Sequence, residues 1–222
     1  MTIRAVLFDL DGTLLDRRAT LRRYLEAQLA RHPDLFRPEE AARYVRRLLE
    51  LDENGSLDRA EFYDRAEGEF GLAEGSGARL LSDFERRFPE ECVPLPNLHE
   101  TLEVLGELQV KVGLITNGGS VIQRRKIRGL GLESSFDVIV ISREFGVGKP
   151  DPRIFSHALR ELGESASASV YVGDNPEPDI LGAKRAGLHS IWRRDEFWAE
   201  PSEADHVIDD LAEVPEWIRS FG

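Results

Sequence analysis

The segment LFDLDGTLLD, residues 7–16, decides the fold, because it joins the end of an apolar strand to two carboxylates. Residues 3–8 are apolar except for one arginine and are rich in branched and aromatic side chains, which is typical of a buried strand. Asp9 and Asp11 follow at the point where such a strand would end. Burying an unpaired carboxylate is costly. We therefore expect other parts of the chain to bring a cation to this strand end.

The composition is that of an acidic globular protein of 222 residues, long enough for one large core with a smaller insertion. Its formal net charge of −12 disfavours a nucleic-acid partner, because phosphate backbones are bound by basic surfaces. Cys92 is the only cysteine, so no disulfide can form within the chain. The first apolar run is broken by Asp9 and Asp11, unlike a signal peptide, and no run is long enough to span a membrane. We expect a cytoplasmic protein with no membrane partner.

Short β-rich runs alternate with helical patterns over most of the chain. The predicted strands are residues 3–8, 111–116, 138–141, 169–172 and 190–193, with a weaker sixth at 206–208. The predicted helices between them are residues 98–108, 120–130, 152–162 and 177–186. Several strands are apolar without alternation, as expected for strands covered on both faces. The pattern predicts a doubly wound, Rossmann-like α/β core with a parallel sheet.

A long helical region interrupts this alternation after the first strand. Apolar residues recur at helical spacing in four stretches between Arg17 and about Glu91, and no strand pattern occurs there. The prolines of VPLPN, residues 93–97, are typical of a semi-rigid connector. We therefore predict an all-helical domain, residues 17–92, inserted into an α/β core formed by residues 1–16 and 93–222.

Four of the predicted strands are followed by short polar sequences. These are DLDGT at residues 9–13, ITNGG at 115–119, GVGKPD at 146–151 and VGDNPEPDI at 172–180. Parallel strands place their carboxyl ends on one edge of a sheet, where α/β proteins bind ligands. Residues far apart in the sequence should therefore meet there, and the lysine of the third sequence is the cation that the first segment requires.

The residue types at this edge favour phosphate chemistry. Asp9 beside Asp174 would raise the pKa of one carboxyl unless a cation intervenes. Carboxylates with a backbone carbonyl suit Mg²⁺, and the lack of nearby His or Cys disfavours zinc. Such an ion, a lysine and the amides of a glycine turn could hold a phosphate dianion. One carboxylate could then act as a nucleophile, and an acid two residues later as general acid and base.

The four sequences resemble, in order and spacing, the motifs of the haloacid dehalogenase-like (HAD) superfamily. FDLDGTLLD, ITNG, GKPDP and VGDNPEPDI carry the resemblance, which covers the whole chain and includes a helical cap inserted after the first strand. The resemblance implies that Asp9 is the nucleophile and a Mg²⁺ ligand. It implies that Asp11 is the general acid/base and offers its backbone carbonyl to the metal. The dehalogenases of the family lack an acid at this second position, so Asp11 favours phosphoryl transfer.

The resemblance also implies roles for the residues on the other three strand ends. Thr116 and the backbone amide of Asn117 would bind phosphoryl oxygens, and Lys149 would neutralise charge on the nucleophile and the phosphate. Asp174 would complete the protein ligands of Mg²⁺. Asp179 would orient metal-bound waters or Lys149.

Each of these residues alone also has a structural interpretation. Asp9 and Asp11 could cap a helix, Thr116 could be an ordinary strand residue, Lys149 a surface lysine and Asp179 a helix cap. Together they predict a Mg²⁺-dependent phosphatase that acts on a small phosphorylated metabolite. Two alternatives remain open: a phosphomutase that uses the same Asp9 and Asp11, and a binding protein without catalysis. The substrate and the oligomeric state are not predicted.

Overall fold

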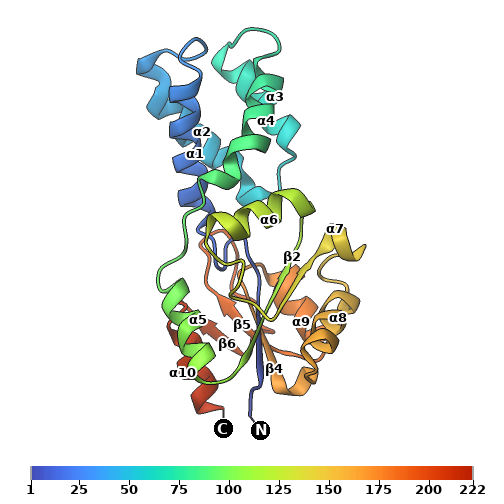
Figure 1. Ribbon diagram of the computed structural model, residues 1–222. Coiled ribbons are helices and arrows are strands. Elements are labelled where there is room, and N and C mark those ends of the chain that lie inside the picture. Colours follow the sequence, from blue (N-terminus) through green and yellow to red (C-terminus); the bar gives the residue numbers. More distant parts are fainter. Residues whose placement is uncertain (1, 222) are drawn as a thin grey trace. The chain divides into compact units, whose positions relative to one another are not determined.

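The computed structural model describes residues 2–221, which form two compact units. One unit contains the chain up to residue 16 and again from residue 94, and the other is Arg17–Val93. Figure 1 shows that the first unit contains all the strands and that the second is built from helices. Each unit is described separately below.

The first unit is an α/β fold around a six-stranded parallel sheet, which confirms the predicted fold class. The strand order is β3-β2-β1-β4-β5-β6. The strands are β1 (Ala5–Phe8), β2 (Lys111–Thr116), β3 (Val138–Ile141), β4 (Ser169–Gly173), β5 (His189–Arg193) and β6 (His206–Ile208). Phe8, the last residue of β1, pairs with Leu114 of β2 on one side and with Val172 of β4 on the other. The end of β1 therefore lies in the middle of the sheet.

Helices cover both faces of this sheet, with α8 and α9 on one side and α5 and α10 on the other (Figure 1). Ala5 and Leu7 pack with Ile154 and Phe155 of α8 in one buried cluster, because alternate residues of β1 face the same way. The helices are α5 (Leu98–Glu107), α6 (Ser120–Gly129), α7 (Ser142–Phe145), α8 (Pro152–Leu162), α9 (Gly182–Arg185) and α10 (Glu213–Ser220). These buried contacts between helices and strands hold the sheet in place. The four polar sequences follow its strands at one edge.

The chain leaves and re-enters the α/β unit at neighbouring points. Leu15 forms a bridge with Pro94, and the backbone N–H of Leu95 donates to the carbonyl of Leu14 at 2.9 Å. The residues before and after the inserted segment are therefore hydrogen-bonded to each other within this unit.

The second unit has four main helices and its own core. They are α1 (Arg17–Arg31), α2 (Ala41–Leu51), α3 (Arg59–Phe70) and α4 (Ser76–Arg87). The side chains of Tyr24, Tyr44, Phe62 and Tyr63 are fully buried in one apolar cluster. α3 begins where the Asp58 side chain accepts hydrogen bonds from two backbone N–H groups, as expected of a helix N-cap. The unit therefore does not depend on the sheet for a core.

A partly buried ion-pair network around Asp52 links α1 and α3 of this unit. The carboxylate of Asp52 accepts hydrogen bonds from the guanidinium groups of Arg17 at 3.0 Å and Arg59 at 2.6 Å. Burial raises the pKa of Asp52, but these two cations outweigh it and hold that pKa below its usual value of 3.8. Asp52 is therefore an ionised group inside the unit.

The structure differs from the sequence-based prediction in three helical regions. The predicted helix over residues 177–186 is divided into a wide helical turn, Pro176–Leu181, and α9. The short α7 and the C-terminal α10 were not predicted. Asp179 therefore lies inside a helical turn, which is capped by the side chain of Asn175. Among the described residues, every helix is too short or too polar to cross a lipid bilayer.

Candidate active site

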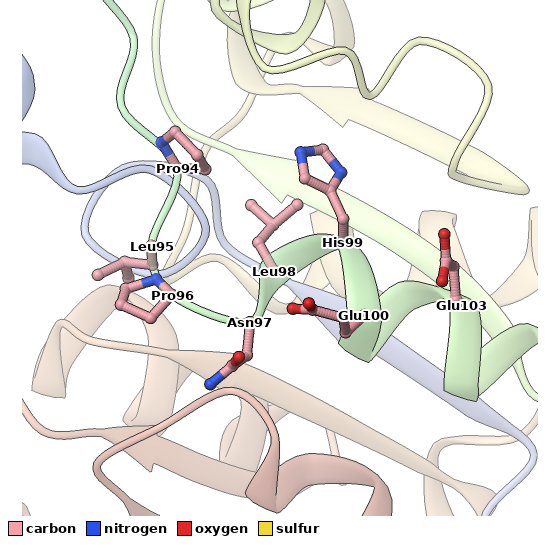
Figure 2. Close-up of a pocket in the computed structure, with 8 residues that line it drawn as sticks. All are labelled: Pro94, Leu95, Pro96, Asn97, Leu98, His99, Glu100 and Glu103. Carbon is pink, nitrogen blue, oxygen red and sulfur yellow. The ribbon is translucent and has the colours of Figure 1, made fainter.

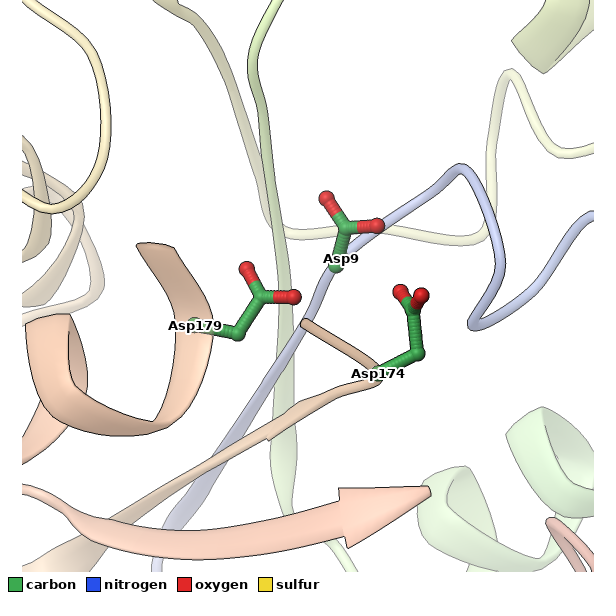
Figure 3. Close-up of side chains that lie close together, drawn as sticks. All are labelled: Asp9, Asp174 and Asp179. Atoms are coloured by element: carbon green, nitrogen blue, oxygen red, sulfur yellow. The ribbon is translucent and has the colours of Figure 1, made fainter. Parts of the chain in front are cut away.

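Three buried aspartates meet beyond the carboxyl ends of the central strands. Asp9 follows β1, Asp174 follows β4, and Asp179 lies in the helical turn after it. Each offers a carboxylate oxygen, and these oxygens all lie within 4.8 Å of one another. Figure 3 shows the three carboxylates converging on one region. The structure thus brings together Asp9, Asp174 and Asp179, which were expected from the sequence to meet at this edge.

Lys149 is the cation that meets these acids. Its ammonium donates to Asp9 Oδ1 at 2.5 Å, to Asp179 Oδ1 at 2.7 Å and to the hydroxyl of Tyr171 at 2.8 Å. An ammonium group has three protons, so these contacts use all of them. Lys149 is therefore held in one position between the nucleophile candidate and Asp179.

The charge of the cluster is only partly neutralised. Burial raises the pKa of Asp9 to about 7, although the Lys149 ammonium acts in the opposite direction and Asp179 adds to the rise. Burial and the neighbouring Asp179 and Asp9 raise the pKa of Asp174 well above its usual value. When all three carboxylates are ionised, the single ammonium leaves an excess of negative charge in the cluster. A divalent cation with oxygen ligands would fit this donor set.

Lys149 is also fixed through its backbone. The side chain of Asn117, after β2, accepts a hydrogen bond from the Lys149 N–H at 2.9 Å and donates to the Lys149 carbonyl at 2.9 Å. A Cβ on Gly148 would lie 2.7 Å from Asn117 Oδ1, so glycine is needed for this close approach. Asn117 therefore holds the lysine loop with its side chain, whereas the sequence had suggested a role only for its backbone amide.

The turn after β1 holds Asp174. Thr13 Oγ1 donates to Asp174 Oδ1 at 3.2 Å, and Trp192 Nε1 donates to the Asp174 carbonyl at 2.5 Å. Gly12 has a φ of +90°, and a Cβ there would lie 2.6 Å from Asp174 Cγ. Only glycine allows this turn to pass so close to the carboxylate.

Asp11 and Thr116 are linked by a residue of α6. Gln123 Nε2 donates to Asp11 Oδ2 at 2.8 Å and to Thr116 Oγ1 at 2.6 Å. The Lys126 ammonium lies 2.7 Å and 2.9 Å from the two carboxylate oxygens of Asp11. The Asp11 carboxylate therefore binds α6, while the other predicted acids face one another.

A separate shallow pocket of about 470 Å³ lies along the connector and the start of α5 (Figure 2). Its lining includes Pro94, Pro96, His99, Glu100 and Glu103. Two acidic side chains disfavour an anionic ligand here, and the predicted site residues are absent from its lining.

The sequence-based prediction missed several residues that contact the site. Tyr171 lies inside an apolar strand, where a hydroxyl gives no signal of its target. Gln123 and Lys126 are three residues apart, and this spacing on one helix face directly after ITNGG was a usable signal. Thr13 is part of the DLDGT sequence itself and could have been proposed from it.

Comparisons with known proteins agree on one family. A family model described as haloacid dehalogenase-like hydrolase matches residues 3–187. The glyceraldehyde 3-phosphate phosphatase of Methanopyrus kandleri is 34% identical over 220 residues, covering 93% of this chain and 91% of that protein. The magnesium-bound HAD-hydrolase YfnB of Bacillus subtilis superposes with a TM-score of 0.78 at 26% identity, covering 98% and 99% of the two chains. A 2-haloacid dehalogenase from Pseudomonas syringae gives a TM-score of 0.65 at 30% identity, with both chains fully covered.

Proposed function

Because this chain belongs to the haloacid dehalogenase-like hydrolases, we propose that it is a Mg²⁺-dependent phosphatase that forms an aspartyl-phosphate on Asp9. The observation that carries the proposal is the buried cluster of Asp9, Asp174 and Asp179 with Lys149 at its side. The substrate would be a small phosphomonoester. Phosphatase activity is supported by the M. kandleri relative, which aligns over nearly all of this chain.

The donor set fits Mg²⁺. Carboxylate oxygens from Asp9 and Asp174, with the backbone carbonyl of Asp11, would supply ligands of the type that this ion prefers. Asp179 would lie beside the ion and hold Lys149, to which it is bound at 2.7 Å. When bound, the ion would shield the negative charge of the carboxylates and of the phosphoryl oxygens.

The first chemical step uses Asp9 and Asp11. A carboxylate oxygen of Asp9 attacks phosphorus and forms an O–P bond, while the bond from phosphorus to the alcohol oxygen breaks. Asp11 gives a proton to that oxygen as it leaves. The hydroxyl of Thr116 and the ammonium of Lys149 bind negative charge on the transferring group.

The second step returns the enzyme to its starting state. Asp11, now ionised, takes a proton from a water molecule that attacks phosphorus. The bond between phosphorus and Asp9 breaks, inorganic phosphate leaves, and the Asp9 carboxylate is restored. No proton or charge is left over, since Asp11 donates in the first step and accepts in the second.

Asp11 favours this reaction over dehalogenation. An alkoxide leaving group needs a proton, whereas a halide does not. We also propose that the helical domain, residues 17–92, acts as a cap domain that excludes bulk water and large substrates during turnover.

Release of inorganic phosphate from a panel of phosphorylated metabolites, with Mg²⁺ and with EDTA, tests the proposal. We expect Mg²⁺-dependent release that Asp9→Asn abolishes, because the amide cannot act as the nucleophile. The matched control is Asp64→Asn, the same change at an exposed residue of α3, which should keep wild-type activity. Conversion of a sugar 1-phosphate into its 6-isomer without release of phosphate would contradict hydrolysis.

A further inference from the structure

Two buried polar residues of α6 bind the candidate acid/base. Gln123 is 2% exposed and Lys126 is 5% exposed, and both contact Asp11 from the same helix face. A buried ion pair adds little stability compared with well-packed apolar residues. Folding alone therefore gives no strong reason for a glutamine and a lysine at these positions.

The orientation of the Gln123 amide follows from its partners. Its nitrogen carries two protons and can only donate, and it lies 2.8 Å from Asp11 Oδ2, which therefore accepts. The same nitrogen lies 2.6 Å from Thr116 Oγ1, so one amide proton points to each oxygen. Because Thr116 Oγ1 accepts this bond, its own hydroxyl proton remains available as a donor. Gln123 thus sets the Thr116 hydroxyl to donate toward an anion.

The same amide fixes the distance between two functional oxygens. Asp11 Oδ2 and Thr116 Oγ1 are both bonded to Gln123 Nε2, so they cannot be farther apart than these two short bonds together allow. The Gln123 amide therefore links Asp11 of the first sequence motif to Thr116 of the second.

Lys126 restrains the rotation of the Asp11 carboxylate. Its ammonium lies within 2.9 Å of both carboxylate oxygens, so rotation of the carboxylate would lengthen at least one contact. The charge-assisted pair is stronger than a neutral hydrogen bond, and its ammonium is buried.

The backbone of the glycine turn packs tightly against Gln123. A Cβ on Gly118 would lie 3.0 Å from Gln123 Cγ and Cδ, and the φ of Gly118 is +144°. The Gly118 N–H donates to the hydroxyl of Ser142 at 3.0 Å, which holds the turn in place. The Gln123 side chain is thus buried and packed against the backbone of this turn.

We propose that Gln123 and Lys126 are positioning residues, which together hold the Asp11 carboxylate and the Thr116 hydroxyl in the arrangement needed to transfer a phosphoryl group. This inference rests on the proposed phosphatase function. Of the two groups proposed to act on the substrate, Lys126 contacts Asp11, whereas Gln123 contacts both Asp11 and Thr116. Substitution of Lys126 should therefore affect acid catalysis only, and substitution of Gln123 should affect both acid catalysis and phosphate binding.

Lys126→Met and Gln123→Met separate the two roles. We expect Lys126→Met to lower kcat about tenfold or more for an alkyl phosphate, to lower it less for p-nitrophenyl phosphate, and to leave KM nearly unchanged. Gln123→Met should also weaken competitive inhibition by inorganic phosphate about tenfold, because the Thr116 hydroxyl loses its orientation. Lys126→Arg should recover part of the lost kcat, since it keeps the cation.

The matched control is Lys184→Met. Lys184 forms a pair with Asp205 at the same distance of 2.7 Å, on α9 and away from the proposed reacting groups. It should keep wild-type kinetics. Equal loss for both substrates in Lys126→Met, unchanged or raised kcat, or the same loss in Lys184→Met would overturn the positioning role.

Failure of the proposed function is a separate outcome. It would appear as a wild-type protein that releases no phosphate from any ester. Crystal structures of the wild type and of Lys126→Met then test the inference without activity. A rotated Asp11 carboxylate in the variant supports the positioning role, and an unchanged one rejects it.

Discussion

Replacing Gly12 with alanine tests whether turnover requires Asp174 to keep its place. Gly12 lies in the turn after β1 with a φ of +90°, and its missing side chain leaves room for the Asp174 carboxylate. A Cβ there would lie 2.6 Å from Cγ and Oδ2 of that carboxylate. The substitution therefore combines backbone strain with a direct steric conflict.

The two effects have different magnitudes. An alanine at positive φ costs about 1–2 kcal/mol of folding free energy. Ordinary contact begins at 3.4 Å, so the Asp174 carboxylate would have to withdraw by about 0.8 Å from the Cβ. Misplacement of a catalytic group by about 1 Å can lower the rate about 100-fold. The loss of activity should thus exceed the loss expected from stability alone.

Gly131→Ala supplies the matched control. Gly131 follows α6 in the same α/β unit with a φ of +71°, and a Cβ there would meet no atom within 4 Å. It should show the same small decrease in melting temperature, a few degrees, without the kinetic defect.

Mg²⁺ titrations of phosphate release, together with thermal melts, measure both effects. We expect Gly12→Ala to need far more Mg²⁺ and to have a kcat about 100-fold lower than wild type, while remaining folded at the assay temperature. If Gly12→Ala kept wild-type turnover and Mg²⁺ dependence, the placement of Asp174 would not matter for function. An equal loss in Gly131→Ala would show that backbone strain explains the result.

Three further predictions concern Asp52, Asp11 and the metal ion. Asp52→Asn should destabilise the helical unit by about 3 kcal/mol at pH 7, because it removes the buried carboxylate that accepts hydrogen bonds from Arg17 and Arg59. The pKa of Asp52 is lower in the folded than in the unfolded state, so its stabilising effect is present above about pH 4 and is lost as the pH falls through the folded pKa. The urea unfolding curves of wild type and variant should therefore converge at low pH. Asp11→Asn should slow the release of alkyl alcohols at least 100-fold but that of p-nitrophenolate much less, measured by steady-state kinetics; equal loss would contradict its role as an acid. EDTA should stop phosphate release, and excess Mg²⁺ should restore phosphate release. Turnover that continues in EDTA would contradict the metal-dependent mechanism.

Much of the sheet was predictable because its strands are short, buried and apolar. The boundaries of β2, β3 and β6 agree with the predicted runs, and the parallel arrangement follows from the alternation with helices. The C-terminal α10 was missed although Val214 and Ile218 are four residues apart and buried. Only eight residues long, it gives too short a pattern to stand out from an irregular segment.

The site was predictable to the extent that it depends on strand ends. Asp9, Thr116 and Asp174 each end or follow a parallel strand, so the topology alone brings them to one edge. The spacing of Gln123 and Lys126 marked a shared helix face, but their contacts could not be derived from it, because the direction of a helical side chain depends on how its helix packs. The position of Asp179 inside a wide helical turn also depended on the three-dimensional structure.

The hydrogen bond between Leu95 and Leu14 has a consequence for how such a protein can change over evolution. The points where the chain leaves and re-enters the α/β unit are adjacent. The length of the intervening 77 residues, Arg17–Val93, therefore has little effect on the geometry of the sheet. Insertions, deletions or wholesale exchange of that segment need only preserve two neighbouring attachment points. A chain in which a short glycine-serine linker replaces Arg17–Val93 should still fold its sheet, so new substrate preferences could be acquired by recombination without rebuilding the chemistry.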